Sequence, residues 1–195
     1  MGEKVSILLD GGFVKKKLAE RNHHFATVAE ITGLCQQVMA YSRLKGGEIF
    51  RIYYYDAPPF EGTSRNPISG AVLNFSITPQ AAQNKALIDS LELQPDFAVR
   101  RGAIIQSGWK LGKVALKALA KTTRAITATD LVPDMAQKGV DIRIGLDIAW
   151  ISLKRIVDVL VLVTGDSDFV PVIKSQEKKV SRSTLKPWDT RFGAS

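Results

Sequence analysis

Acidic side chains follow three apolar runs of this sequence, at positions where they could act together on a phosphate group. The apolar run 157–163 ends at Gly165-Asp166-Ser167-Asp168, and two earlier runs end at Asp10 and Asp56. Long β-branched runs with little polar alternation are typical of parallel strands buried on both faces. Because the carboxyl ends of parallel strands meet at one edge of a sheet, we expect these carboxylates to converge there.

Such a cluster is suited to a divalent cation. Mg²⁺ and Mn²⁺ prefer carboxylate oxygens, and a bound cation can orient a phosphate, lower the pKa of an attacking water and stabilise the leaving oxygen. Asp141 should begin a helix that descends from the same edge, so it could join the cluster or simply cap that helix. Asp168 lies two residues after Asp166, in the first turn of the next predicted helix, 166–176.

Two other aspartates are placed further away by the geometry of regular elements. At about 3.3 Å per strand residue, Asp158 lies roughly 26 Å from Asp166 and belongs to the opposite end of the sheet. Asp147 follows Asp141 by six residues, which on a helix is about 9 Å of rise and a rotation of about 240°. It is either a supporting carboxylate or a buried, paired one.

Other catalytic patterns fit the sequence poorly. His23 and His24 lack the helical His-Glu-x-x-His spacing of zinc proteases, and there is no Gly-x-Ser-x-Gly nucleophile turn. Gly11-Gly12 is shorter than a dinucleotide fingerprint or a phosphate loop. The short glycine pair disfavours an enzyme that uses a nicotinamide cofactor or ATP, and the other two absences disfavour a zinc protease and a Gly-x-Ser-x-Gly hydrolase.

The elements that must position the carboxylates alternate along the chain. Strands are predicted at 4–9, 48–55, 97–105 and 157–163, with the stretch 58–70 as a long loop. Helices are predicted at 13–21, 27–43, 78–93, 110–121, 141–153 and 166–176. This alternation predicts an α/β three-layer sandwich with a mainly parallel central sheet. A further strand after Lys174 is expected to be short, altered or missing.

Length and composition favour a single soluble domain. The chain has 195 residues, and we expect one domain over 1–180 and a polar, basic tail over 181–195. No apolar run approaches the roughly 20 residues of a membrane helix, and no leader precedes the first strand. Cys35 is the single cysteine, so a disulfide framework is excluded and a reducing cytoplasm is the simplest location.

The charge of the chain favours a polyanionic partner. The formal net charge is +8, and seven basic residues but no acidic residue lie between Phe97 and Thr129. Lysines at helical spacing beside an aromatic side chain could bind single-stranded nucleic acid, although such a stripe can also be solvated surface. The residues expected to contact nucleic acid from this run are Arg100, Arg101, Trp109, Lys110, Lys113, Lys117 and Lys121, and Arg124 completes its basic set.

Three blocks of the sequence together resemble the NYN domain, also called the LabA-like or DUF88 family. They are Ile7-Leu8-Leu9-Asp10-Gly11-Gly12, Lys138-Gly139-Val140-Asp141 and Leu162-Val163-Thr164-Gly165-Asp166-Ser167-Asp168-Phe169. The resemblance implies a PIN-like, Rossmann-type fold and a metal-dependent ribonuclease activity. It assigns catalytic roles to Asp10, Asp141, Asp166 and Asp168, with Mg²⁺ or Mn²⁺ bound by the first three and, with less support, by Asp56 and Asp147. Lys138 in the second block is expected to contact the nucleic acid.

Three hypotheses remain open at this point. The first is a ribonuclease of RNA, most simply single-stranded, with the basic run along the RNA backbone. The second is an RNA-binding or regulatory module with little catalysis, since many members of the family carry Asn where this chain has Phe13. The third is a small-molecule phosphohydrolase using the same carboxylates. None of them needs a membrane, and an assembly of several copies is compatible with each.

Overall fold

A five-stranded parallel sheet forms the centre of the molecule, with the strand order β5-β2-β1-β8-β9. The computed structural model describes residues 2–169, 171 and 182–185. The strands of this sheet are β1 (Lys4–Asp10), β2 (Glu48–Asp56), β5 (Phe97–Arg101), β8 (Val159–Val163) and β9 (Arg182–Leu185). The predicted α/β architecture with a parallel central sheet is therefore confirmed.

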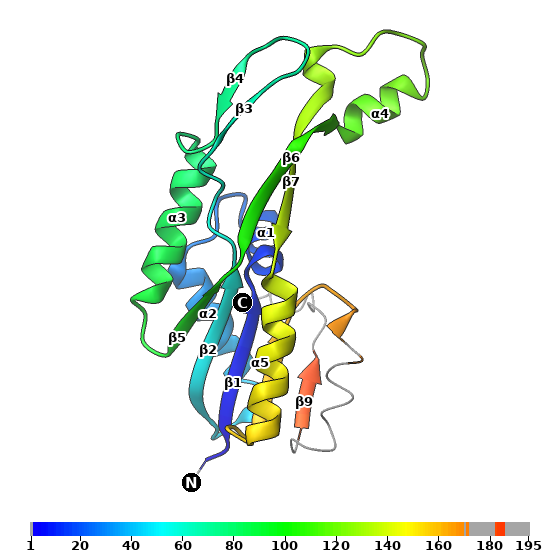
Figure 1. Cartoon of the computed structure of the whole chain (residues 1–195). Coiled ribbons are helices and arrows are strands. Elements are labelled where there is room, and N and C mark those ends of the chain that lie inside the picture. Colours follow the sequence, from blue (N-terminus) through cyan, green and yellow to red (C-terminus); the bar gives the residue numbers. More distant parts are fainter. Residues whose placement is uncertain (1, 170, 172–181, 186–195) are drawn as a thin grey trace.

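Helices cover both faces of the sheet, as Figure 1 shows. One face carries α1 (Gly11–Asn22), α2 (Val28–Met39) and α3 (Pro79–Glu92), and the other carries α5 (Val140–Lys154). Successive strand residues alternate between the two cores, because Ile7 and Leu9 face the first group of helices while Leu8 faces α5. The short helix η1 (Ser42–Leu44) follows α2.

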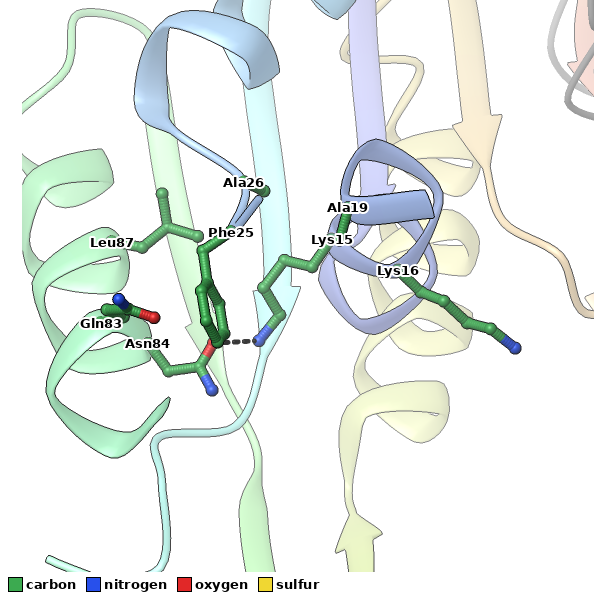
Figure 2. Close-up of a pocket in the computed structure, with 8 residues that line it drawn as sticks. All are labelled: Lys15, Lys16, Ala19, Phe25, Ala26, Gln83, Asn84 and Leu87. Carbon is green, nitrogen blue, oxygen red and sulfur yellow. Dashed lines mark hydrogen bonds between the residues drawn. The ribbon is translucent and has the colours of Figure 1, made fainter. Parts of the chain in front are cut away.

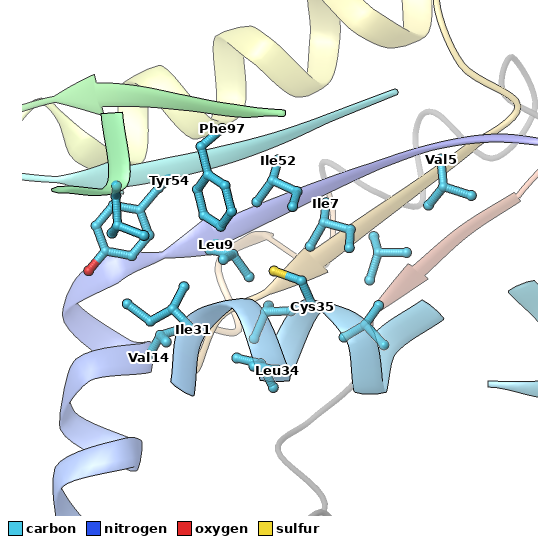
Figure 3. Packing of buried hydrophobic residues seen from close by; sticks show 14 of the residues in the cluster. Val5, Ile7, Leu9, Val14, Ile31, Leu34, Cys35, Ile52, Tyr54 and Phe97 are labelled. Carbon is cyan, nitrogen blue, oxygen red and sulfur yellow. The ribbon is translucent and has the colours of Figure 1, made fainter. Parts of the chain in front are cut away.

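The larger core is built from the helical periodicity of α2 against β1. Figure 3 shows Ile31, Leu34 and Cys35 of α2 beside Ile7 and Leu9 of the central strand. A capping box fixes the start of α2, since the Thr27 side chain accepts from the backbone of Glu30 and the Glu30 side chain accepts from that of Thr27. Cys35 is buried in this core, and its burial raises the pKa of the thiol to about 12.

Two antiparallel hairpins extend beyond the carboxyl edge of the parallel sheet (Figure 1). The first is formed by β3 (Thr63–Arg65) and β4 (Val72–Asn74). The second, here called the arm, spans residues 103–138. It consists of β6 (Ala103–Leu111), α4 (Lys113–Leu119), η2 (Ala128–Asp130) and β7 (Leu131–Lys138).

Polar side chains tie the two hairpins together. The indole Nε1 of Trp109 donates to Ser64 Oγ at 2.8 Å, and Gln106 Nε2 donates to the same oxygen at 3.0 Å. Asn66 Nδ2 donates to the carbonyl oxygen of Ala128 at 3.1 Å. Trp109 is therefore half-buried and held by the neighbouring hairpin, so it is less available for stacking than the sequence suggested.

In and around the arm, the secondary structure expected from the sequence differs from the structure. The expected strand 97–105 is divided at Gly102, where a Cβ would lie 2.7 Å from the Lys138 carbonyl oxygen and from Val140 Cγ2. The expected helix 110–121 begins only at Lys113, and its first two residues belong to β6. The expected loop 58–70 contains the first strand of a hairpin, and β7 was not predicted.

The ends of the sheet agree with the predicted polarity. The Asp158 carboxylate accepts from the backbone N–H of Lys4 at 2.8 Å, which places it at the amino end of β1, far from Asp10. β9 is a four-residue strand, so the last strand is short and present. Most of the predicted helix 166–176 lies outside the described residues. Within those that are described, no helix is long and apolar enough to cross a membrane.

Candidate active site

Asp10 lies at the carboxyl end of the central strand and also begins the first helix. Its Oδ1 accepts from the backbone N–H of Phe13 at 3.1 Å, which is the hydrogen bond of a helix N-cap. Its Oδ2 accepts from the Thr164 hydroxyl at 3.0 Å. The next residue must be glycine, since a Cβ at Gly11 would lie 2.7 Å from the Tyr55 carbonyl oxygen. Packing at the edge of the sheet thus accounts for the glycine of the Asp-Gly pair, while the aspartate caps the helix.

The electrostatic environment of Asp10 disfavours its negative charge. Burial raises the pKa of the Asp10 carboxyl most strongly, and the carboxylates of Asp141 and Asp56 raise it further. The hydrogen bonds from Phe13 and Thr164 act in the opposite direction, but the net shift is upward. A carboxylate in this situation is stabilised by a bound proton or by a nearby cation.

Asp141 occupies the first turn of α5, on the other side of the sheet edge. The N-cap of this helix is Gly139, with φ +80°, and no side chain caps it. The capping role considered for Asp141 is therefore not observed, although its charge still favours the positive end of the helix dipole. Asp141 is exposed, and its charge reaches Asp10.

The turn after β8 is connected to Asp10 through a threonine hydroxyl. Thr164 Oγ1 donates to Asp10 and accepts from the backbone N–H of Asp166 at 3.1 Å. The Asp166 carboxylate accepts from the backbone N–H of Asp168 at 2.8 Å, and both aspartates are exposed. Thr164 was not singled out from the sequence. Its position between an apolar strand and Gly165-Asp166 is the signal that could have identified it.

Phe13 packs against the same turn. An ideal Cβ on Gly165 would lie 2.5 Å from Cδ2 and Cε2 of the Phe13 ring. The aromatic ring therefore covers the backbone of Gly165 and requires a glycine there. This contact gives Phe13 a packing role beside the carboxyl edge of the sheet around Asp10, Asp141 and Asp166, here called the acidic edge.

The Asp56 carboxylate is buried and occupied by protein partners. Lys15 Nζ lies 2.6 Å from Oδ2, the Tyr54 hydroxyl donates to the same oxygen at 3.3 Å, and the backbone N–H of Ala57 donates to Oδ1 at 2.9 Å. Asp56 is 2% exposed. Its charge is therefore balanced by the ammonium group of Lys15.

Asp147 belongs to α5 and takes part in a separate hydrogen-bond network with the sheet. Its Oδ2 accepts from the Tyr55 hydroxyl at 2.8 Å and from Arg100 Nε at 3.0 Å. The Arg100 guanidinium in turn lies 5.2 Å from the centre of the Tyr53 ring. These contacts place Asp147 among paired carboxylates that join α5 to the sheet.

The donor set at the acidic edge matches a hard divalent cation in its chemistry, because Asp10, Asp141 and Asp166 all offer carboxylate oxygens. Their positions match such a site less well than their chemistry does. Among the described residues, no group of three or more His, Cys, Asp or Glu side chains is close enough to hold a metal ion. The Asp141 carboxylate is close enough to raise the pKa of Asp10, and hydrogen bonds through Thr164 link Asp166 to Asp10.

A hollow between α1 and α3 lies beside this edge and is shown in Figure 2. Its volume is about 230 Å³, and the Lys15 ammonium that pairs with Asp56 also donates to Asn84 Oδ1 at 3.0 Å on its wall. A second hollow of about 670 Å³ shares Ala19, Phe25 and Gln83 with it and adds His23 and His24. The Phe25 ring is 46% exposed. Cations, amides and an exposed ring thus line one groove.

Most of the predicted basic patch is paired with carboxylates that lie outside the run between Phe97 and Thr129. Arg100 pairs with Asp147, Lys110 with Asp134, and Arg124 with Asp130. Arg101 pairs with both Asp89 and Glu92. The patch is therefore less positive than the sequence between Phe97 and Thr129 indicated.

Four lysines keep the character that the sequence suggested. Lys113, Lys117, Lys121 and Lys138 are exposed, and no ion pair is recorded for them within the described part of the chain. The first three lie on or just after α4, at the far end of the arm, whereas Lys138 lies at its base. The structure thus separates one lysine near the acidic edge from three at the distal helix.

Comparisons with known proteins found one similar solved structure and one matching family. Among solved structures, the chain is similar to a protein of unknown function from Vibrio parahaemolyticus, with 18% identity and a TM-score of 0.49. That match covers 94% of this chain and 80% of the other. No curated protein matches the sequence. The NYN domain matches residues 5–182, which include the edge formed by Asp10, Asp141 and Asp166. On the strength of this match over most of its length, the chain belongs to the NYN domain family.

Proposed function

We propose that this NYN domain is a divalent-metal-dependent ribonuclease whose reaction centre is the acidic edge around Asp10. The observation that carries the proposal is the state of Asp10, a carboxylate at the end of the central strand whose pKa is raised by burial and by neighbouring carboxylates. Perturbed carboxyl groups of this kind are concentrated at functional sites. A cation bound there would relieve the same repulsion.

Asp10, Asp141 and Asp166 would hold the cation, with Asp168 beside them. When bound, Mg²⁺ or Mn²⁺ supplies a Lewis acid for the phosphate and a more acidic water. Thr164 orients the centre, since its hydroxyl fixes Asp10 Oδ2 and the backbone of Asp166. We do not assign Asp56 and Asp147 to the metal, because Lys15 and Arg100 already balance their charges.

The substrate surface in this proposal begins at the groove between α1 and α3. Lys15 connects the groove to the acidic edge through Asp56, and Phe25 offers an exposed ring on which a base could stack. Gln83 and Asn84 supply amide groups for contacts with a base or a sugar. Lys138 and the lysines of the arm offer further contacts with phosphates.

The discriminating experiment compares cleavage of single-stranded RNA, single-stranded DNA and a small phosphate ester in Mg²⁺, Mn²⁺ or EDTA. We expect RNA cleavage only with metal. Asp166→Asn should lower the rate by more than about 100-fold, the upper end of the effect of residues that merely support metal ligands. Asp158→Asn is the matched control, because this exposed aspartate lies at the opposite end of the sheet. Equal metal-dependent rates for Asp166→Asn and the wild type would refute the assigned centre.

A second candidate function is RNA binding with little or no cleavage. It is favoured by the lack of a three-residue metal group among the described residues. RNA bound tightly but left intact in every metal would support this candidate and exclude the nuclease. Hydrolysis of the small ester alone would instead indicate a phosphohydrolase.

A further inference from the structure

Helix α5 is apolar on both sides. Its inner face buries Ile144, Ile148 and Ile151 against the sheet. Its outer face carries a stripe of four large apolar side chains, and their exposed fractions are 70% for Ile142, 64% for Leu146, 58% for Trp150 and 60% for Leu153. A surface helix normally presents polar residues to water, and one that is apolar all round is normally buried on all sides.

The outer stripe has the shape of a ridge beside a groove. Ile142, Leu146 and Trp150 are spaced by four residues and form the ridge. The adjacent row runs from Asp141 through Gly145 and Ala149 to Leu153, so its two middle residues are small, and a Cβ at Gly145 would meet no atom within 4 Å. A glycine inside a helix costs about 1 kcal/mol relative to alanine. Its presence here leaves open space next to large side chains.

We propose that the outer face of α5 binds the same face of a second copy of this chain. The ridge of one helix fits the groove of the other, and the reverse contact follows by two-fold symmetry. Ridges spaced by four residues interdigitate at a crossing angle of about −50°. Self-complementarity of this kind singles out a second copy over an unrelated partner, because one helix supplies both halves of the fit.

The available area suits a small dimer interface. At roughly 200 Å² for a fully exposed large side chain, the four residues present on the order of 500 Å² per copy, near the upper end for patches on monomers. Two copies would bury about 1,000 Å² from these side chains alone, which reaches the lower limit of a specific interface. Arg143 and Lys154 are exposed and would lie at the rim.

The primary test is the mass of the full chain in solution, measured by sedimentation equilibrium. We expect a species of twice 21.4 kDa for the wild type. Leu146→Glu should give the monomer, because a charge would enter the centre of the ridge. Leu93→Glu is the matched control. This leucine lies at the end of α3 and is 84% exposed, so its substitution should leave the dimer intact. A wild type that stays monomeric at high concentration would overturn the proposal.

A cross-linking experiment locates the surface independently of dimer strength. Cys35 is buried with a raised pKa, so an introduced surface cysteine would be the reactive one. Ala149→Cys should be joined to a second copy by a short bismaleimide, while the exposed control Ala82→Cys should not. A dimer that survives Leu146→Glu and cross-links equally through both cysteines would assign the interface elsewhere and refute the role of α5. Both readouts are independent of any nuclease activity.

Discussion

At the scale of single residues, Asp10, the centre of the proposed site, illustrates how a buried carboxylate can oppose stability. Its carboxylate is held in place by Phe13 and Thr164 and is disfavoured by burial and by two other carboxylates. The fold therefore binds a proton at this group more readily than the unfolded chain does. This difference has a measurable consequence for both activity and stability.

We expect Asp10→Asn to abolish metal-dependent cleavage without loss of stability. Because the pKa is raised in the folded state, the wild type loses stability as the pH rises from about 4 through that raised value. The asparagine variant has no such loss, so at neutral pH its free energy of unfolding should equal or exceed that of the wild type. Calorimetry across this pH range checks the sign. A variant less stable at pH 7 than at pH 4, relative to the wild type, would contradict it.

Gly165 is the second position with a sharp expectation. Gly165→Ala places a Cβ 2.5 Å from the Phe13 ring and should cost about 1–3 kcal/mol, as overpacking does. Phe13→Leu should remove most of that cost. Urea denaturation of the two single variants and the double variant gives the coupling energy. Simple additivity of the two changes would show that the ring is not the constraint.

At the scale of elements, the buried ion pair between α1 and β2 anchors the first helix beside the groove. Lys15→Met would leave Asp56 buried without its counter-charge and should cost about 2–4 kcal/mol, somewhat less than for a fully buried pair because Lys15 is 21% exposed. Adding Asp56→Asn should recover much of the loss. Chemical denaturation measures both effects, with Lys17→Met as a control at an exposed pair. No recovery in the double variant would argue against the pair.

The elements show where sequence reasoning succeeds and where it stops. The apolar runs before Asp10 and Asp166 have a single physical explanation, burial on both faces, so strands β1 and β8 could be predicted. β7 contains Pro133 and Asp134, is partly exposed along its length and has no such pattern. The pairing of Lys15 with Asp56 and of Arg100 with Asp147 joins residues 41 and 47 positions apart. No local pattern encodes those contacts.

At the scale of the whole molecule, the arm is an appendage of the core. Among the described residues, neither apolar core includes a side chain from residues 103–138. The chain enters and leaves the arm at Ala103 and Lys138, which are paired in register, as are Ile104 and Gln137. The core should therefore fold with the arm removed.

We expect replacement of residues 105–136 by a short glycine and serine linker to leave a folded core with weaker binding of RNA. If Lys113, Lys117 and Lys121 contact phosphates, the slope of log K against log salt should fall by about 2 for a single strand. Substituting only these three lysines by glutamine should reproduce that change in slope. Binding titrations at several salt concentrations measure it, and calorimetry confirms folding. An unchanged slope in both variants would place the RNA elsewhere.

The order of the strands in the sheet also determines how long the core remains incomplete while the chain is being synthesised. The central strand β1 pairs with β2 on one side, but on the other side it pairs with β8, whose first residue comes 149 positions after Asp10. At a translation rate of about 5–20 residues per second, one edge of the strand waits roughly 7–30 seconds for its partner. During this interval Val5, Ile7 and Leu9 have no β8 against them. This nascent chain should therefore depend on chaperones until β8 leaves the ribosome.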